Sequence, residues 1–320
     1  MPETTPRVAL LDGPTPLQAM PRFGASLGHA RLWVKRDDCM ALGFGGNKLR
    51  SLEYWLGAAL AENADMLVVA GSLASNQCRL TAAAAAKVGL DALVLYAGDI
   101  DAPLRGNAAL TQLYGATIRR LGPVGEAERG RLARAAVAEL RAAGRRPYLI
   151  GDPVLAAFGY VRAVEELHAQ ARDIDLRHLV LPGSMGPTEA GVIHAAAALD
   201  LPWTIHLVSV EYEADALRAR LAAILDAMAA RLDVATPRSA LARVRIEMGQ
   251  LGEGYGKATQ ASRDAASALG RLEALTLEQT YVAKTFAGLS ALIAAGVIPR
   301  EEAACVIHTG GGPAFFEQIG

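Results

Sequence analysis

The sequence contains few cysteines, and the three that it has are scattered. Cys39, Cys78 and Cys305 form no CxxC pair. This spacing predicts neither a disulfide framework nor a zinc site, and we expect no other metal site. A chain with so few thiols and no disulfide pattern suits a reducing compartment, which predicts a cytoplasmic protein.

The sequence also lacks long apolar runs and an excess of charge of one sign. No run approaches the ~18 apolar residues of a membrane span. The opening MPETTPRVALLDG has neither the basic start nor the apolar core of a signal peptide. The formal net charge is −1, and no basic stripe is interleaved with the few aromatic residues. We therefore expect neither a membrane nor a nucleic acid as a partner.

Apolar residues, by contrast, are abundant. They make up 52% of the 320 residues, whereas charged residues make up 20%. This composition is typical of a soluble globular protein with a sizeable core. The length corresponds to one large domain or two ordinary ones.

Short β-branched runs alternate with alanine-rich helical runs along almost the whole chain. Strands of this kind, separated by helices, predict an α/β fold of mainly parallel sheets covered on both faces. We expect a compact four-strand unit between about residues 50 and 155. The expected strands are 32–38, 66–71, 92–98, 117–122, 147–151, 178–184, 204–210 and 304–310, and the expected helices are 49–63, 76–90, 106–115, 126–144, 156–170, 187–199, 213–232, 259–271 and 278–295.

Glycine-rich turns follow three of these strands, where ligands of parallel sheets bind. GSMGPT brings Gly183, Ser184, Gly186 and Thr188 to the start of a helix, a pattern that can enclose one phosphate with backbone N–H groups and hydroxyls. It is neither a P-loop nor a GxGxxG motif. The alternative is an ordinary strand-to-helix turn capped by Thr188.

The lysine in GFGGNKLR (43–50) needs an explanation, because the chain has only five lysines against twenty-seven arginines. Lys48 is a surface charge at a helix start, a phosphate binder or a nucleophile. Ser75 and Asn76 follow another strand, where helix capping is the default role. Thr309 ends a strand and can hydrogen-bond a ligand, whereas His308 before it is interpreted as a core residue. A lysine beside a glycine turn, a single phosphate cradle and strand-end hydroxyl and amide groups together indicate pyridoxal phosphate held as a Schiff base.

Several motifs, in order, resemble those of a known family. These are KRDD (35–38), GGNK (45–48), SNQ with Arg79, GYG (254–256), Tyr-x-x-Lys-x-x-x-Gly-Leu (281–289) and HTGG-x-PA (308–314). The sequence is similar to 1-aminocyclopropane-1-carboxylate deaminases and D-cysteine desulfhydrases over nearly its whole length. These are fold type II, tryptophan synthase β-like, pyridoxal phosphate enzymes.

The resemblance implies two three-layer α/β/α domains, a small one at 50–157 and a large one from 1–49 and 158–320, in a homodimer. It implies that Lys48 forms the Schiff base and acts as acid and base. Ser75, Tyr255 and Tyr281 would line the reacting face, and Ser75 and Gln77 would bind the substrate carboxylate of a small amino acid. The implied cofactor ligands are Lys48, Asn76, Gly183, Ser184, Met185, Gly186, Thr188 and Thr309.

The sequence departs from the family at positions that bear on the reaction. Val282 follows Tyr281 where the deaminases carry Glu and the desulfhydrases Thr facing the ring nitrogen, although Thr309 can partly substitute. Pro187 and Glu189 stand where the desulfhydrases tend to have Gly and His. GSLASNQ and IGDPVLAAFGY (150–160) also differ from the family pattern.

Val282 favours a short-lived carbanion, as in β-elimination or β-replacement, and the changed substrate loops are compatible with β-replacement. The leading interpretation is β-elimination from a small, D-cysteine-like amino acid, with release of ammonia and a keto acid. The alternatives are a 1-aminocyclopropane-1-carboxylate deaminase, against which Val282 counts, and a β-replacement synthase of specialised metabolism. A non-catalytic protein that binds pyridoxal phosphate or an amino acid belongs to a different class. The arginines of 126–144 are interpreted as a solvated helix face. Asp37 and Asp38 are either paired structural carboxylates or residues that help to fix the lysine loop.

Overall fold

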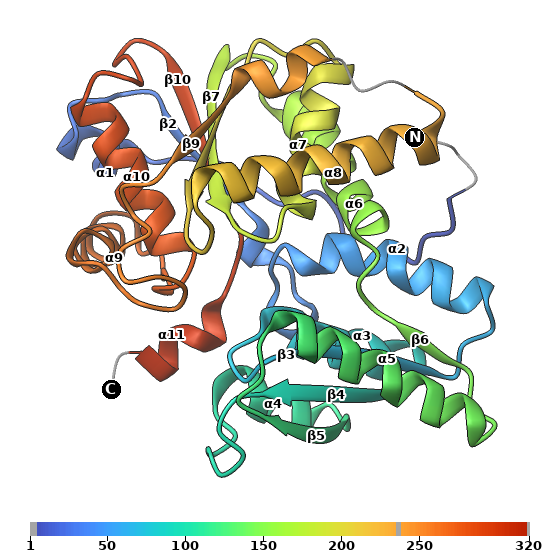
Figure 1. The fold of residues 1–320 in the computed structure, drawn as a ribbon. Coiled ribbons are helices and arrows are strands. Elements are labelled where there is room, and N and C mark those ends of the chain that lie inside the picture. The colour runs from blue at the N-terminus through green and yellow to red at the C-terminus, as the bar shows by residue number, and fades with distance from the viewer. Residues whose placement is uncertain (1–4, 235–237, 319–320) are drawn as a thin grey trace.

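The computed structural model describes residues 5–234 and 238–318, and the chain forms two sheets with helices on both faces (Figure 1). The larger sheet has six strands in the order β1-β2-β10-β7-β8-β9. Only β1 is antiparallel to its neighbour. The strands are β1 (Leu17–Ala19), β2 (Leu32–Arg36), β7 (Leu176–Gly183), β8 (Thr204–Ser209), β9 (Val244–Glu247) and β10 (Ala303–His308).

The smaller sheet has four strands in the order β5-β4-β3-β6, all parallel. Its two central strands are almost continuously buried, as their runs of Leu and Val require for a sheet covered on both sides. The strands are β3 (Met66–Ser72), β4 (Asp91–Ala97), β5 (Thr117–Gly122) and β6 (Pro147–Leu149).

Helices cover both faces of the larger sheet. On one face α6 (Pro153–Gln170), α7 (Pro187–Ala198) and α8 (Ala214–Leu232) enclose a core that includes Leu179, Leu207 and Leu221. On the other face a second core contains side chains of three further helices, which are α1 (Pro21–Ser26), α9 (Gln260–Glu273) and α10 (Val282–Ala294).

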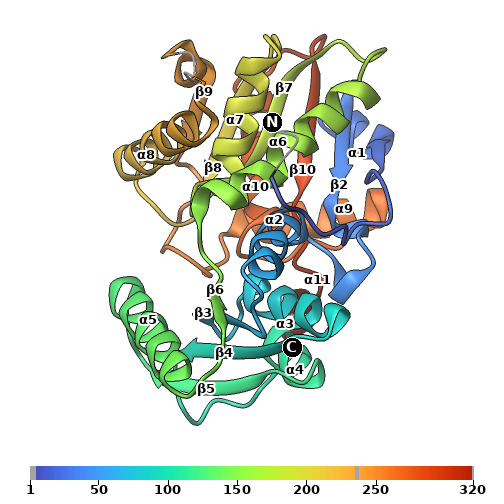
Figure 2. The ribbon, with the colours of Figure 1, turned by 90° about the vertical axis from the view of Figure 1, so that its right-hand side faces the viewer.

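The smaller sheet is covered in the same way, as Figure 2 shows from the side. Helix α5 packs on one face through Ala136 and Val137. The other face contacts α2 and α3, and α11 packs against α4. The bounds are α2 (Lys48–Ala61), α3 (Asn76–Val88), α4 (Gly106–Leu113), α5 (Glu126–Ala142) and α11 (Gly312–Gln318), and three 3₁₀ turns occupy Asp37–Cys39, Leu42–Phe44 and Arg238–Arg243.

This architecture confirms the predicted α/β class with mainly parallel sheets. The sequence did not indicate β1, α1, β9 or α11, which are short or at the margins of the sheets. The helix expected over 278–295 begins only at Val282, because the Glu278 carboxylate accepts hydrogen bonds from the backbone N–H groups of Thr280, Tyr281 and Val282 and so caps the helix there. In the ranges that the structure describes, no helix is both long and apolar enough to cross a bilayer.

Candidate active site

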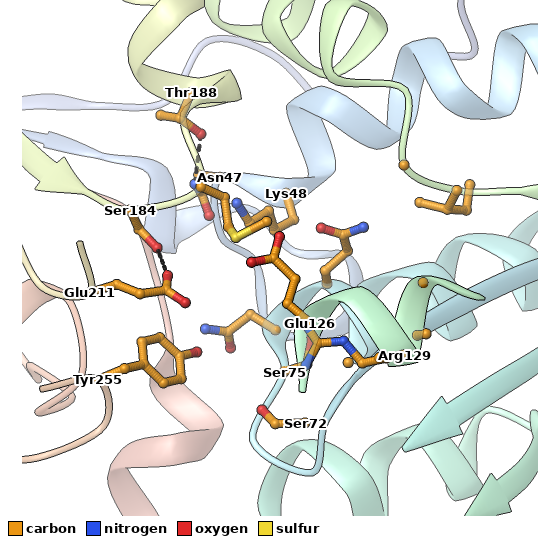
Figure 3. Close-up of a pocket in the computed structure, with 18 of the residues that line it drawn as sticks. Asn47, Lys48, Ser72, Ser75, Glu126, Arg129, Ser184, Thr188, Glu211 and Tyr255 are labelled. Carbon is orange, nitrogen blue, oxygen red and sulfur yellow. Dashed lines mark hydrogen bonds between the residues drawn. The ribbon is translucent and has the colours of Figure 1, made fainter. Parts of the chain in front are cut away.

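A cavity of about 1120 Å³ opens between the two sheets, at the carboxyl ends of β3, β7 and β10 (Figure 3). Parallel strands direct their loops to this edge, which is where ligands of such sheets bind. Gly183 and Gly186 belong to one of its loops without lining it. Ten of the twelve predicted site residues do line it: Lys48, Ser75, Asn76, Gln77, Ser184, Met185, Thr188, Tyr255, Tyr281 and Thr309.

Lys48 is the first residue of α2, and two glycines place it at the cavity. Gly45 has a φ of 66°, and a Cβ there would lie 2.5 Å from the Met40 carbonyl oxygen, so only glycine fits the turn. The Asn47 N–H donates to the Thr309 carbonyl at 2.9 Å, which joins the lysine loop to the end of β10. The glycine turn therefore serves to bring Lys48 beside the tip of a distant strand.

The Lys48 amine has no hydrogen-bond partner among the described residues. Burial lowers its pKa, and the negative charges of Glu189 and Glu211 oppose that shift in part. An amine that loses its proton more readily than a surface lysine is a better nucleophile and base. The place of Lys48 in the cavity is compatible with the predicted nucleophile.

A buried ion-pair network fixes the first turn of α2. Arg50, two residues after Lys48, donates to Asp37 through Nε at 2.9 Å and Nη2 at 2.7 Å. Asp37 also accepts from the hydroxyls of Tyr160 at 2.5 Å and Thr15 at 2.8 Å, and Arg50 reaches Glu166 at 3.0 Å. The interpretation of Asp37 as a structural carboxylate is confirmed, and its position shows that it holds the lysine-bearing turn.

The GSMGPT loop forms an anion cradle between β7 and α7. Gly186 has a φ of 99°, and a Cβ there would lie 2.8 Å from Ile224, which explains the glycine. A carboxylate already interacts with this loop, because Glu189 accepts from the Ser184 N–H at 2.6 Å. Burial raises the pKa of Glu189, although backbone N–H groups and the charge of Lys48 partly offset this effect.

Two side chains connect the cradle to the rest of the cavity (Figure 3). Asn47 donates to the Thr188 hydroxyl at 3.1 Å, so the residue before Lys48 holds the start of α7. The Ser184 hydroxyl donates to Glu211 at 2.5 Å. The sequence analysis assigned no role to Asn47, although the residue is part of the GGNK motif, and it missed Glu211, which belongs to no recognisable motif.

The start of α3 faces the same cavity. Ser75 caps the helix by accepting from the Cys78 N–H at 3.2 Å, which confirms the predicted cap. The Asn76 side-chain oxygen accepts from Asn107 at 3.1 Å and from Arg79 at 3.3 Å. Because both contacts engage the oxygen, the Asn76 NH₂ group remains available as a donor.

Tyr255 and Tyr281 meet across the opposite side of the cavity. Their hydroxyls lie 2.6 Å apart and their rings pack edge to face. Burial raises the pKa of both phenols, and that of Tyr281 lies well above its usual value. Both therefore stay protonated at neutral pH and can pass a proton along a short path.

Two neighbouring positions do not enter the cavity. Val282 is fully buried in the apolar core. His308 is also buried; its Nε2 contacts the Thr276 carbonyl at 3.1 Å, and its Nδ1 contacts the Gly310 N–H at 3.2 Å. The interpretation of His308 as a satisfied core residue is confirmed.

The prediction of a solvated arginine face on α5 was incomplete, because part of this face borders the cavity. Arg129 and Arg134 line the cavity, together with Glu126 at the start of α5. Their positions at i, i+3 and i+8 lie on one side of a helix, so the spacing contained the signal. It was not recognised because several other arginines of α5 carry the same charge, and the sequence does not show which side of the helix faces the sheet edge.

The residues present fit a cofactor that combines a phosphate with an aldehyde. A backbone N–H group of the cradle donates to the Glu189 carboxyl group, so the cradle presents a hydrogen-bond donor that an anion can use. An amine with a lowered pKa faces the cavity, and the Asn76 amide offers a donor between them. Pyridoxal phosphate has these functional groups.

Comparison with known proteins agrees with this fit. The model of the family described as "Pyridoxal-phosphate dependent enzyme" matches residues 8–310. A D-cysteine desulfhydrase of Salmonella paratyphi B is 32% identical over 97% of this chain and 95% of its own length. The crystal structure of a protein described as an ACC deaminase homologue superimposes with a TM-score of 0.89 and 31% identity, over 99% of this chain and 95% of that one.

A more distant structure shows the same fold. A threonine deaminase of T.th. is 24% identical and superimposes with a TM-score of 0.68, over 93% of this chain and 92% of its own. The family match spans both sheets and every loop that lines the cavity. The chain therefore belongs to the pyridoxal-phosphate dependent enzyme family.

Proposed function

We propose that the protein is a lyase that removes a β-substituent from a small amino acid, with D-cysteine as the reference substrate. The observation that carries this proposal is the meeting of Lys48, the α3 N-terminus and the tyrosine pair in one cavity. The products are ammonia, a keto acid and the released substituent.

The cradle and the residues next to it would bind the cofactor. Pyridoxal phosphate, when bound, condenses with the substrate amine and withdraws electrons from the α-carbon. The loop Gly183–Thr188, with the hydroxyls of Ser184 and Thr188, would hold the phosphate. The free Asn76 amide would donate to the ring oxygen, and Thr309 would contact the ring nitrogen.

Lys48 would link the cofactor to the chain and move the proton of the α-carbon. Its lowered pKa leaves a neutral amine available as the base. The α-proton passes to the Lys48 amine, and the electrons of that C–H bond form a double bond between the α- and β-carbons as the substituent leaves with the electron pair of its own bond. The released enamine takes up a proton at the β-carbon and becomes an imine, which water hydrolyses to the keto acid and ammonia.

Ser75 and Gln77 would bind the substrate carboxylate. They lie at the N-terminus of α3, where unpaired N–H groups and the helix dipole favour an anion. The protonated Tyr255 and Tyr281 pair would donate a proton to the departing substituent.

The position of Val282 supports β-elimination over opening of a cyclopropane ring. In the deaminase branch that the sequence resembles, a carboxylate follows the tyrosine. Here the corresponding side chain is apolar and packed in the core, so it can neither accept nor donate a hydrogen bond. A reaction that depends on a proton held at that position is therefore disfavoured.

Keto-acid release by the purified holoenzyme tests the proposal. The panel is D-cysteine, L-cysteine, β-chloroalanine and 1-aminocyclopropane-1-carboxylate, with ammonia and keto acid measured together. We expect equal amounts of both from a β-substituted substrate, loss of this activity in Lys48→Ala, and retention in the control Lys87→Ala on the exposed side of α3. Release from the cyclopropane substrate alone would overturn the proposal.

We also propose that residues 50–157 form the small domain and that residues 1–49 and 158–320 form the large one. In support, all strands of the smaller sheet lie within 66–149, and those of the larger sheet lie outside that range. A cytoplasmic location is supported by Cys39, Cys78 and Cys305 being free thiols.

We propose that the enzyme is a homodimer. Phe44, Leu113 and Phe316 are 62%, 75% and 72% exposed. All three belong to segments around α4. Leu113 is the last residue of α4, and Phe316 is in α11, which packs against α4. Phe44 follows Gly43, where a Cβ would lie 3.8 Å from Tyr114 at the end of α4. Apolar side chains gathered on a surface support an interface. Light scattering of Leu113→Asp tests this, since a mass equal to that of a wild-type dimer would argue against α4 as the contact.

A further inference from the structure

Two arginines of α5 face the cavity without a partner of opposite charge. Arg129 and Arg134 line it from the small-sheet side, and Figure 3 shows Arg129 extending from α5 into the space that Glu126 and Ser75 also border. Among the described residues neither guanidinium group makes a hydrogen bond or an ion pair. Sequence reasoning predicted only a solvated face for these cations.

Other arginines near them are paired. Arg131, on another side of the same helix, forms a bidentate contact with Glu128 at 2.7 and 2.6 Å. Arg220, which also lines the cavity, approaches Glu126 at 3.4 Å. The two arginines of α5 that line the cavity thus lack an anionic partner in the described part of the chain, whereas Arg131 and Arg220 have one.

The carboxylates of the cavity are engaged elsewhere. Glu126 accepts from the Tyr212 hydroxyl at 3.1 Å and from Arg220. Glu189 accepts from the backbone of the cradle, and Glu211 accepts from Ser184. Asp152, the fourth carboxylate that lines the cavity, pairs with Arg231 at 2.8 Å. None of the four neutralises Arg129 or Arg134, so the charge of these arginines is available to a ligand.

The Arg134 side chain lies beside Gly130. A Cβ on Gly130 would be in ordinary van der Waals contact with Arg134 Nη1, at 3.5 Å, so the Arg134 side chain turns back over the N-terminal half of α5. This brings it toward the turn that carries Arg129. Two guanidinium groups on adjacent turns offer several N–H donors in forks that match carboxylate, sulfonate and phosphate oxygens.

The two guanidinium groups are separate from the residues that would bind the amino-acid part of the substrate. Under the proposed function, Ser75 and Gln77 at the start of α3 take the α-carboxylate and Lys48 takes the α-proton. Arg129 and Arg134 come from a different element, α5, and add positive charge to the cavity in excess of what the α-carboxylate requires. A cation there is matched by a second negative charge on the substrate.

We propose that the substrate is an amino acid whose β-substituent carries an anionic group, and that Arg129, assisted by Arg134, binds that group. This inference rests on the proposed β-elimination. The α-proton and the electron pair move as in that reaction, and the arginines bind and orient the substituent without exchanging a proton with it. Arg129 is then the residue that determines specificity between charged and neutral substituents.

Kinetics of the holoenzyme on matched substrates test the inference. Both stereoisomers of O-phosphoserine, with an anionic substituent, are compared with both stereoisomers of β-chloroalanine, with a neutral one. We expect Arg129→Gln to lower kcat/KM for O-phosphoserine by about 10- to 100-fold, the loss of a charge-assisted hydrogen bond. For β-chloroalanine we expect a change of less than about threefold, and Arg131→Gln, on the same helix, should change neither value.

The outcomes separate this inference from the proposed function. Turnover of β-chloroalanine with no preference for O-phosphoserine, and no effect of Arg129→Gln, overturns the inference and leaves β-elimination standing. If neither substrate is turned over, the proposed β-elimination is refuted. Calorimetry of ligand binding then tests whether Arg129 binds an anionic group. Aspartate should bind more tightly than the similarly sized 2-aminobutyrate, and only in chains that retain Arg129; equal binding overturns the inference.

Discussion

The buried carboxylate of Asp37 provides a quantitative test of how the lysine-bearing turn is held. Replacing Asp37 with alanine removes an acceptor that is fully buried and takes hydrogen bonds from Arg50, Tyr160 and Thr15. Arg50 would keep only Glu166 as an ionic partner. A buried Arg50 guanidinium that loses one of its two carboxylate partners lowers the free energy of unfolding.

The expected loss follows from the type of contact. Breaking a buried ion pair by removing one partner destabilises a protein by about 3–5 kcal/mol, and Glu166, which is partly exposed, compensates for a fraction of that. We therefore expect Asp37→Ala to lower the free energy of unfolding by about 3 kcal/mol. Asp38→Ala is the matched control, since Asp38 pairs with Arg36 in a partly exposed bridge, which predicts about 1 kcal/mol or less.

The difference in free energy of unfolding between wild type and Asp37→Ala should depend on pH in one direction. Burial alone would raise the pKa of Asp37, but Arg50 and the hydrogen bonds hold it below the usual value. A carboxyl whose folded pKa is depressed adds stability above its unfolded pKa and loses it as the pH falls through the folded one. The gap between wild type and Asp37→Ala should thus be largest near neutral pH and shrink below about pH 4.

Urea unfolding of the cofactor-free protein, followed by circular dichroism at several pH values, measures these quantities. Wild type, Asp37→Ala and Asp38→Ala are compared under identical conditions. A loss for Asp37→Ala no larger than that of Asp38→Ala would refute the reasoning that a buried network holds the first turn of α2.

Further predictions concern the cradle and the helix contact beside Arg50. Glu189→Gln should bind pyridoxal phosphate about tenfold more tightly near pH 8, because a like charge leaves the cradle. Since burial raises the pKa of Glu189, wild-type affinity should approach that of the variant as the pH falls; equal dialysis binding at all pH values would contradict this. Gly159→Ala should cost about 1–3 kcal/mol in thermal unfolding, because its Cβ would lie 2.4 Å from the Arg50 backbone; an unchanged melting temperature would contradict it.

Much of the fold was predictable because the strands β3, β4, β7, β8 and β10 are short apolar runs between amphipathic or alanine-rich helices. In these strands the local sequence pattern and the burial in the fold both favour a β-strand. The short strand β9 reads VRIE and the strand β1 has three residues, so neither carries a pattern long enough to recognise. Their pairing depends on partners far away in the sequence.

The site was predictable where it consists of loops with special backbone requirements. The glycines before Lys48 and inside GSMGPT mark turns that only glycine fits, and motif order placed Ser75 and Asn76 beside them. Arg129, Arg134 and Glu211 could not be predicted this way. Their side chains reach the cavity because of the orientation of α5 and of the segment after β8, which tertiary packing determines.

The absorption spectrum of the purified protein, combined with borohydride reduction and peptide mapping, tests the central claim most directly. The account predicts a yellow protein whose visible band disappears on reduction, with the cofactor label on Lys48 and no label in Lys48→Ala. A protein that takes up no added pyridoxal phosphate, or that carries the label on Lys87, Lys257 or Lys284, would contradict it.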